Sequence, residues 1–220
     1  RIQLEKTYKN IQEYFKKHPK LQLITGFIGS TDNNETTTIG RGGSDYSASI
    51  FGAALNADEI QIWTDVDGIM TADPRKVRKT FSIPNLTYQE AMEMSHFGAK
   101  VIHPPTMQPA LAKNIPISIR NTFNPDFSGS IISNKKDSNG LPVKGISSIG
   151  NISLLRVQGS GLVGVAGISN RLFGALSREK ISVILISQAS SEHSICFAIP
   201  TDGAEKAKKA IEQEFELEIY

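Results

Sequence analysis

The chain has 220 residues, 39% apolar and 21% charged, a composition that supports one large or two small domains with apolar cores. Its 24 basic and 22 acidic residues leave a formal net charge of +2, and the basic residues are scattered, which argues against a nucleic-acid partner. No apolar run approaches the roughly 20 residues of a membrane span, and the first residues do not resemble a signal peptide. The single cysteine, Cys196, argues against disulfides and cysteine-based zinc sites and favours a reducing cytoplasm.

Upstream of a polar segment at 124–145, short apolar runs alternate with helix-length patterns, which is typical of an α/β layer structure. In chain order we expect a helix over 5–17, a buried strand over 21–27, a helix over 44–56, a strand over 59–64, a helix over 87–97, a short strand over 99–103, a helix over 106–113 and a strand over 115–122. The strands are expected to pair in parallel.

The polar segment itself is rich in Asn, Ser, Gly, Lys and Pro and contains one short apolar island, Ile131 and Ile132, so it is interpreted as a hinge between two parts. Downstream we expect a strand over 153–158, a helix over 165–179, strands over 181–188 and 193–200 joined by a hairpin-length gap, a helix over 203–215 and a last strand over 216–220. This βαββαβ order is the ferredoxin-like plan.

The loop GRGGSDYSA, which precedes the helix expected at 44–56, combines residues suited to an anion. Gly42 and Gly43 let the backbone approach a ligand, and Ser44 is a good N-cap with Asp45 at the first helical position. Free amides at a helix N-terminus attract anions, and Arg41 can form a fork on a carboxylate or phosphate. A small anionic substrate fits this loop, and a capped strand-to-helix turn without a ligand is the alternative.

The segment IWTDVDGIMTADPR carries a strand end followed by three carboxylates. Thr64 and Asp65 end the strand, and Asp67 and Asp73 follow. Ligands in open α/β sheets bind beyond the carboxyl ends of strands, where a Thr-Asp pair can hold a ribose, a base edge or a metal-bound water. An acidic solvated loop is the alternative. Lys100 in FGAKVIHP is a further cationic candidate, although alone it would more often be a surface lysine.

Three blocks, GRGGSDYSA, IWTDVDGIMTADPR and LTYQEAMEMSHFGAKVIHP, together resemble the diagnostic blocks of the aspartokinase branch of the amino-acid kinase family, in the same order. The resemblance runs through nearly the whole chain. It implies an α/β fold in which the C-terminal half of an amino-acid kinase sandwich is followed by a ferredoxin-like ACT domain.

The resemblance also implies transfer of the γ-phosphoryl group of ATP to the side-chain carboxylate of L-aspartate, with Mg²⁺. A carboxylate with a pKa of about 4 is ionised at neutral pH, so this nucleophile needs no general base. The difficulty is electrostatic, because an anion approaches a polyanion, and cations, Mg²⁺ and backbone amides must neutralise the charge. No protein ligand to a metal is assigned.

Residue roles follow from the same resemblance. Arg41 and Ser44 hold the aspartate, and Phe27 of GFIGS lines the same pocket. Asp45 resembles the family's catalytic aspartate, which organises the catalytic lysine and the phosphates. The positions that match nucleotide contacts are Thr64, Asp65, Met70, Arg75 and Lys100. Met70 departs from the family, in which an aromatic residue is common there, so base stacking is expected to be weaker.

The start of the chain departs further from the family, which opens with a strand and a KFGGTS-like block whose lysine bridges the transferring phosphate. Nothing in the sequence matches that block, and no acidic residue ahead of GFIGS is a candidate to hold the substrate's amino group. We therefore expect a fragment with half of an active site, inactive in isolation. The expected domains are 1–128, the C-terminal part of the kinase domain; 129–148, a linker with the orphan strand PVKGIS of a second ACT unit; and 149–220, an ACT regulatory domain.

In the second part, VQGSGLVG satisfies the GxGxxG pattern of dinucleotide-binding folds through Gly159, Gly161 and Gly164. That interpretation is disfavoured, because the second strand ends in Ser187 and Gln188 rather than an acidic residue, and a hairpin follows. These glycines match the loop of an ACT domain instead. The expected effector contacts are Gly161, Val163, Gly164, Ser187 and Gln188. The alternative for Gln188 is a purely structural role at a strand end.

ILISQASSEHSICF resembles the form found in bifunctional aspartokinase and homoserine dehydrogenase chains, whose effector is usually threonine. The expected partners are therefore L-aspartate, ATP, an amino-acid effector, with threonine preferred over lysine, and a second copy of the chain through paired ACT domains. A non-catalytic module that binds amino acid and mediates oligomerisation is the alternative function. An amino-acid kinase acting on glutamate or a nucleotide is disfavoured, because the ACT-like half accompanies the TDVDGIMTADPR block.

Overall fold

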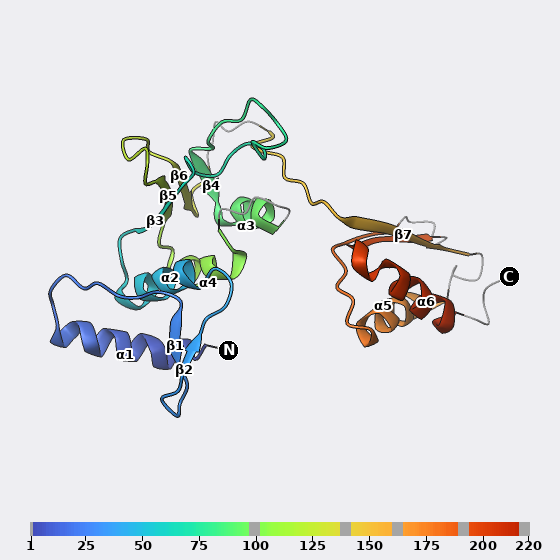
Figure 1. Ribbon diagram of the computed structural model, residues 1–220, viewed down its shortest axis with the longest axis horizontal. Helices are drawn as coiled ribbons and strands as arrows, with labels where there is room; N and C mark the ends of the chain where they lie inside the picture. The colour runs from blue at the N-terminus through green and yellow to red at the C-terminus, as the bar shows by residue number, and fades with distance from the viewer. Residues whose placement is uncertain (1, 97–101, 137–141, 160–164, 189–193, 216–220) are drawn as a thin grey trace. The chain divides into compact units, whose positions relative to one another are not determined.

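The computed structural model describes residues 2–96, 102–136, 142–159, 165–188 and 194–215. The chain divides into two compact units, Arg1–Ser148 and Ile149–Tyr220 (Figure 1). Each unit has its own apolar core, and each is described separately below.

The first unit is built on a four-stranded sheet with the order β3-β5-β6-β4. β3 (Ile60–Thr64) pairs in parallel with β5 (Ile117–Asn121), as predicted. β6 (Ser130–Ser133) is antiparallel to β5 and parallel to β4 (Asn85–Thr87). β6 was not among the expected strands, and it is antiparallel to β5 because the short connection at 122–129 has no room for a crossover and turns the chain back.

The described residues of the first unit also form four helices, and three of them match predicted helices closely: α1 (Leu4–Lys17), α2 (Gly43–Leu55) and α4 (Pro104–Lys113). The helix expected at 87–97 is also confirmed as far as α3 (Tyr88–His96) extends. α1 packs on α2, and α2 packs along α4. The largest side chains buried between the sheet and these helices are Ile69, Leu86, Tyr88, Met107, Ile117, Ile119 and Ile132.

The prediction of a buried strand at 21–27 is wrong. Its residues are not in a strand, and Leu21 and Leu23 are fully exposed, at 101% and 103% of the reference area. The neighbouring strand is instead β1 (Ile28–Ser30), which pairs antiparallel with β2 (Thr36–Thr38). An apolar strand-like pattern forms a strand only where another strand pairs with its backbone, and among the described residues only Phe27, at the end of this segment, makes such a bond, with the Ile39 N–H.

The short strand expected at 99–103 is not found in its described part. Residues 99–101 lie outside the described residues, and Ile102 and His103 are not in a strand. His103 is instead the N-cap of α4, followed by Pro104 at the first helical position. The residue before a proline is held in an extended conformation, which suits a helix start as well as a strand end.

Residues 129–148, expected to be a linker with an orphan strand, lie in the first unit. The apolar island predicted within the hinge is β6, and Ile132 is fully buried. Residues 142–147 form no strand. They are held to the first unit instead, where the Ile146 N–H donates to the Thr71 carbonyl at 2.8 Å.

The second unit has the predicted order of elements through its last described helix. β7 (Ile152–Gln158), β9 (Ser194–Pro200) and β8 (Leu185–Gln188) form an antiparallel sheet in the order β7-β9-β8. Figure 1 shows α5 (Ile168–Arg178) and α6 (Ala204–Glu214) on one side of this sheet. The last strand, expected at 216–220, lies outside the described residues.

Ser130 joins the sheet of the first unit to the loop after β3, and this contact generates a test of the fold. Its fully buried hydroxyl accepts from the Ile69 N–H at 2.8 Å and donates to the Ile83 carbonyl at 2.6 Å. Ser130→Ala should leave both backbone groups unpaired and lower the free energy of unfolding of this unit by about 1 to 3 kcal/mol. Urea unfolding followed by fluorescence of Trp63, the sole tryptophan, reports on this unit. Equal midpoints for Ser130→Ala and for a control at the exposed Ser128 would contradict the assignment.

Candidate active site

The loop before α2 ends at Gly42, which is the N-cap of the helix. Gly42 has a φ of 68°, in the left-handed region that favours glycine, and its carbonyl accepts the first helical hydrogen bond from the Tyr46 N–H at 2.9 Å. The prediction that Ser44 is the N-cap is therefore wrong, and Asp45 is the third helical residue rather than the first. Ser44 makes no cap hydrogen bond, and the residue is exposed.

The N-termini of α2 and α4 meet at this loop. A Cβ atom added at Gly42 would lie 3.0 Å from the Cβ of His103 and 3.3 Å from the Cγ2 of Thr106, and both residues belong to the first turn of α4. Each helix N-terminus carries a partial positive charge of roughly +0.5 from its unpaired N–H groups. Arg41, which precedes Gly42, is exposed. Two helix ends and a guanidinium thus create a positive potential suited to a small anion.

Phe27 lies against the first turn of α2 in an unusual backbone conformation, with a φ of 74°. Its N–H donates to the Ser47 hydroxyl at 3.0 Å, and its carbonyl accepts from the Ile39 N–H at 2.9 Å. A Cβ at Gly43 would lie 2.6 Å from the Phe27 ring, so the ring covers the start of the helix. A bulky residue held at positive φ by its surroundings is typical of functional sites. Ser47, which fixes this geometry, is not among the predicted site residues.

Asp45 is a partly buried carboxylate in the first turn of α2. Burial raises its pKa above the ordinary value. Within the described part of the chain, the side chains of Arg41, Ser44 and Asp45 make no hydrogen bond or ion pair with other side chains. An acidic group that is desolvated without a charge partner beside a helix N-terminus is a candidate for a functional role.

A second group of polar residues lies where β3 and β5 end side by side. The Thr64 hydroxyl donates to Asp65 at 3.2 Å. Asp67 accepts from the side-chain amides of Asn121 at 2.8 Å and Asn124 at 3.2 Å. The two asparagines were missed by the sequence analysis, and the only signal for them is their place at the carboxyl end of the predicted strand 115–122. The network fixes the start of the loop that follows β3.

The end of the same loop carries Arg75, which is bound to Asp73 by two side-chain hydrogen bonds, at 3.0 and 2.8 Å. These bonds, together with the Arg75 backbone N–H, lower the pKa of Asp73 to about 2. The Arg75 side chain is 73% exposed, so it is oriented by Asp73 and still open to solvent. Met70 forms an isolated bridge with Ser82 within the loop.

The structure thus divides the predicted site residues into two described groups within the first unit. Phe27, Arg41, Ser44 and Asp45 surround the start of α2, whereas Thr64, Asp65, Met70 and Arg75 lie on or after the end of β3. Among the described residues, no hydrogen bond or ion pair joins one group to the other. Lys100, Gly161, Val163 and Gly164 lie outside the described residues. Ser187 and Gln188 are exposed residues of β8, opposite Cys196 and Ile195 of β9.

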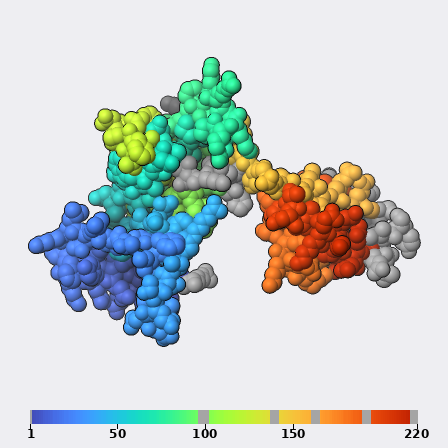
Figure 2. Space-filling model, in the orientation of Figure 1, coloured from blue at the N-terminus to red at the C-terminus, as the bar shows by residue number. Residues whose placement is uncertain are grey.

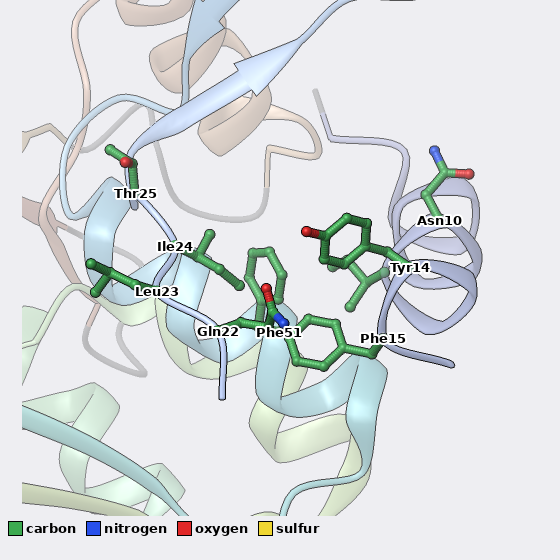
Figure 3. Close-up of a pocket in the computed structure, with 9 residues that line it drawn as sticks. Asn10, Tyr14, Phe15, Gln22, Leu23, Ile24, Thr25 and Phe51 are labelled. Carbon is green, nitrogen blue, oxygen red and sulfur yellow. The ribbon is translucent and has the colours of Figure 1, made fainter. Parts of the chain in front are cut away.

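A pocket of about 430 Å³ lies apart from both groups, between α1, α2 and the segment at 22–25. In Figure 3, Phe15 of α1 and Ile24 point toward Phe51 of α2. The lining residues are Asn10, Ile11, Tyr14, Phe15, Gln22, Leu23, Ile24, Thr25 and Phe51. Because no cationic side chain is among them, this pocket does not suit a phosphate or a small dicarboxylate.

Two searches of the described residues bear on metals and membranes. No group of three or more His, Cys, Asp or Glu residues there could hold a metal ion by itself. Mg²⁺ often takes only one or two carboxylates together with substrate phosphates, so the oxygen atoms of Thr64, Asp65 and Asp67 still fit a nucleotide-bound Mg²⁺. None of the described helices has the length and apolar character needed to cross a membrane.

Comparison with known proteins gives two family matches. Residues 2–121 match the amino acid kinase family, and residues 155–215 match an ACT domain. The bifunctional aspartokinase/homoserine dehydrogenase of Haemophilus influenzae is 45% identical over 218 residues, which cover 99% of this chain and 27% of that protein. The chain therefore spans about a quarter of the length of that relative.

Two solved structures of E. coli aspartokinase III resemble the chain. The structure in complex with lysine and aspartate has a TM-score of 0.71 and 31% sequence identity, and the match covers 97% of this chain and 48% of that one. The structure in complex with aspartate and ADP has a TM-score of 0.58 and 26% identity, covering 93% of this chain and 63% of that one.

Asp45 gives a pH-dependent test of the site. Because burial raises its pKa in the folded state, the native state binds its proton more tightly than the unfolded state, and stability falls as pH rises through the unfolded and then the folded pKa. Asp45→Asn should therefore raise the melting temperature at pH 7, and the gain should vanish below pH ~3, where both forms are neutral. Thermal unfolding between pH 3 and pH 7 measures this, with Asp126→Asn, an exposed position, as the matched control. A gain that is the same at every pH would contradict the assignment.

Proposed function

Because this chain belongs to the amino acid kinase family, we propose that its first unit contributes the aspartate-binding and part of the nucleotide-binding surface of an aspartate kinase. The reaction is transfer of the γ-phosphoryl group of ATP to the side-chain carboxylate of L-aspartate, giving 4-phospho-L-aspartate. The second unit, an ACT domain, binds an amino-acid effector that regulates this activity. The similarity to aspartokinases across nearly the whole chain supports this choice of acceptor over other substrates of the family.

The observation that carries the proposal is the meeting of two helix N-termini beside an exposed arginine. L-Aspartate brings two carboxylates, so it needs a positive potential and a directional partner. The N-termini of α2 and α4 supply the potential, and the Arg41 guanidinium forms two parallel hydrogen bonds with one carboxylate. The exposed Ser44 adds a further hydrogen bond through its hydroxyl, and the Phe27 ring, which covers the start of α2, lines the aspartate site.

The chemistry is an in-line displacement. An oxygen of the aspartate side-chain carboxylate forms a bond to the γ-phosphorus while the bond from that phosphorus to the β,γ-bridging oxygen breaks, and ADP leaves with the electron pair. The attacking carboxylate is already ionised at neutral pH, so no residue has to remove a proton. When Mg²⁺ is bound with the nucleotide, it neutralises phosphate charge. Asp45, in the first turn of α2, is assigned the role of the family's catalytic aspartate, which organises the catalytic lysine and the phosphates.

The nucleotide is held by the residues after β3. Thr64 and Asp65 offer oxygen atoms at the end of the strand, and Arg75 presents a guanidinium already oriented by Asp73. Met70 contributes an apolar contact to the base. Lys100, which belongs to the family block LTYQEAMEMSHFGAKVIHP, is proposed as a further nucleotide contact on its sequence position alone.

Regulation and assembly are assigned to the second unit. Its sheet has helices on one side, and apolar side chains remain exposed on its strands, including Leu154 at 72% and Ile186 at 53%. Exposed apolar strands of this kind favour pairing with a second copy of the chain. We place the effector, threonine in preference to lysine, at such a pairing, in contact with Ser187 and Gln188. The lone cysteine agrees with a reducing, cytoplasmic setting.

The second candidate function is a non-catalytic module that binds an amino acid and mediates oligomerisation, and the exposed apolar strands of the ACT unit favour it. An assay of acyl phosphate with hydroxylamine distinguishes the two functions. The full-length protein should form the hydroxamate only when ATP, Mg²⁺ and L-aspartate are all present. If no hydroxamate forms while threonine or lysine still binds, the kinase proposal is wrong and the module is correct.

Arg41 provides the sharpest test of the aspartate site. Arg41→Ala in the full-length protein should raise the KM for aspartate by about 10- to 100-fold, because a charge-assisted pair of hydrogen bonds is lost. The KM for ATP should change little. Arg41→Lys should rescue poorly, since a point charge cannot replace the guanidinium fork. Steady-state kinetics with each substrate varied in turn decides the matter, and an unchanged aspartate KM would exclude Arg41 from the site.

Gln188 tests the effector site. Its side chain can both donate and accept hydrogen bonds with a bound amino acid, so Gln188→Ala should weaken effector binding by about 1 to 3 kcal/mol. Inhibition of the full-length enzyme should then require more threonine, while the rate without effector stays close to that of the wild type. Inhibition curves that superimpose on the wild type for both threonine and lysine would show that Gln188 is only structural.

A further inference from the structure

Residues 144–148, here called the strap, are the last part of the first unit before the chain enters the second unit at Ile149. They form neither helix nor strand. Even so, four of the five make specific contacts with the rest of the first unit, through Lys144, Gly145, Ile146 and Ser148. A connector with this many contacts is unlike a free linker, which the composition of 124–145 suggested.

Lys144 anchors the strap to α3. Its ammonium group donates to Glu90 at 3.0 Å and to the Asn85 carbonyl at 3.4 Å, and only 18% of its side chain is exposed. The same Glu90 oxygen accepts from the Thr87 N–H at 2.7 Å, and the Thr87 hydroxyl accepts from the Glu90 N–H at 3.2 Å. This reciprocal pair is a capping box at the start of α3. Burial alone would raise the pKa of Glu90, but the Thr87 N–H and Lys144 lower it overall.

Gly145 brings the strap into close contact with the loop after β3. A Cβ atom there would lie 3.1 Å from the Thr71 carbonyl oxygen, 2.7 Å from the Cε of Met94 and 3.2 Å from the Cδ1 of Ile83. An added side chain would therefore press on the Thr71 carbonyl and would require the Met94 and Ile83 side chains to move. The glycine is needed here for space rather than for a special backbone conformation.

The strap then holds the loop at two points. The Ile146 N–H donates to the Thr71 carbonyl at 2.8 Å, and the Lys76 ammonium donates to the Ser148 hydroxyl at 2.8 Å. Thr71 directly follows Met70, and Lys76 directly follows Arg75. In Figures 1 and 2 the connector, yellow to orange, runs beside the base of the green loop that follows β3. Of the proposed nucleotide contacts, Arg75 therefore lies between the two anchors, and Met70 lies directly before the first of them.

We propose that the strap is a positioning element for the nucleotide, in which Lys144 and Gly145 fix the geometry of the loop at 69–76 without touching the substrate. The inference rests on the proposed function for the identity of the ligand, but not for the ordering of the loop. Displacement of a substrate-binding loop by about 1 Å can cost on the order of 100-fold in rate. The chain passes directly from Ser148 into the second unit. A change in that unit can therefore alter the proposed nucleotide-binding loop through the same contacts.

Two substitutions of different chemistry test the strap in the full-length protein. Lys144→Met keeps the length of the side chain and removes its charge, and it leaves the capping box between Thr87 and Glu90 in place. Gly145→Ala adds one methyl group against the Thr71 carbonyl and leaves Lys144 unchanged. Lys144→Arg is the conservative variant expected to restore function. Lys136→Met, at an exposed lysine outside the strap, is the matched control.

Two measurements are made on each variant. Amide hydrogen exchange should become faster by about tenfold or more in the segment at 69–76 for Lys144→Met and Gly145→Ala, because its anchors are released. The KM for ATP should rise by about tenfold with the KM for aspartate within about twofold of the wild type. Lys144→Arg and Lys136→Met should match the wild type in both measurements.

The outcomes separate this inference from the proposed function. The wild-type protein could form no hydroxamate while exchange at 69–76 still becomes faster in Lys144→Met and Gly145→Ala. In that case the kinase proposal fails and the strap still orders the loop. If exchange in the segment at 69–76 is unchanged in both variants, with melting temperatures equal to the wild type, the strap does not hold the loop. A rise in the KM values of both substrates by the same factor would show a general structural effect and would overturn the positioning role.

Discussion

The close approach of the first turns of α2 and α4 is the constraint on which the rest of the first unit depends. It requires a residue at position 42 that has no side chain and can adopt a φ of 68°. A larger residue would press on His103 and Thr106 and displace α4, and β5 follows α4 directly. Since β5 pairs with both β3 and β6, the same glycine affects the position of the sheet and the geometry of the proposed anion site. A substitution of Gly42 would therefore change the packing of α4 and the proposed anion site together.

Elements whose side chains pack within the described chain could be predicted from the sequence. α1, α2 and α4, and the strands β3, β5, β7 and β9, follow the expected apolar patterns closely. The failures occurred where local pattern and long-range pairing disagree. The segment at 21–27 has the pattern of a strand without a described partner, whereas Ser130–Ser133 looked like part of a polar hinge and is a central strand. Only Ile131 and Ile132 indicated that strand, and its two neighbours in the sheet come from distant parts of the sequence.

The candidate site was predicted only in part, for a different reason. The residues named from the family blocks are those that would touch a ligand, and the described ones lie at the start of α2 or after β3. The residues that hold them in place have no motif of their own. Ser47, Asn121, Asn124 and Lys144 act through hydrogen bonds to groups that are distant in the sequence. Such contacts depend on the tertiary fold, so a pattern within one segment cannot indicate them.

The backbone conformation of Phe27 has a consequence for how this protein can change over time. An L-residue at a φ of 74° carries strain that glycine would not, and the cost is offset by bonds to Ser47 and Ile39. Under selection for heat tolerance alone, glycine or asparagine would be favoured at this position, because both adopt positive φ more readily. Under selection for catalysis, the aromatic ring over the first turn of α2 would be retained. If Phe27 lines the proposed aspartate site, position 27 is thus one at which stability and substrate binding favour different residues.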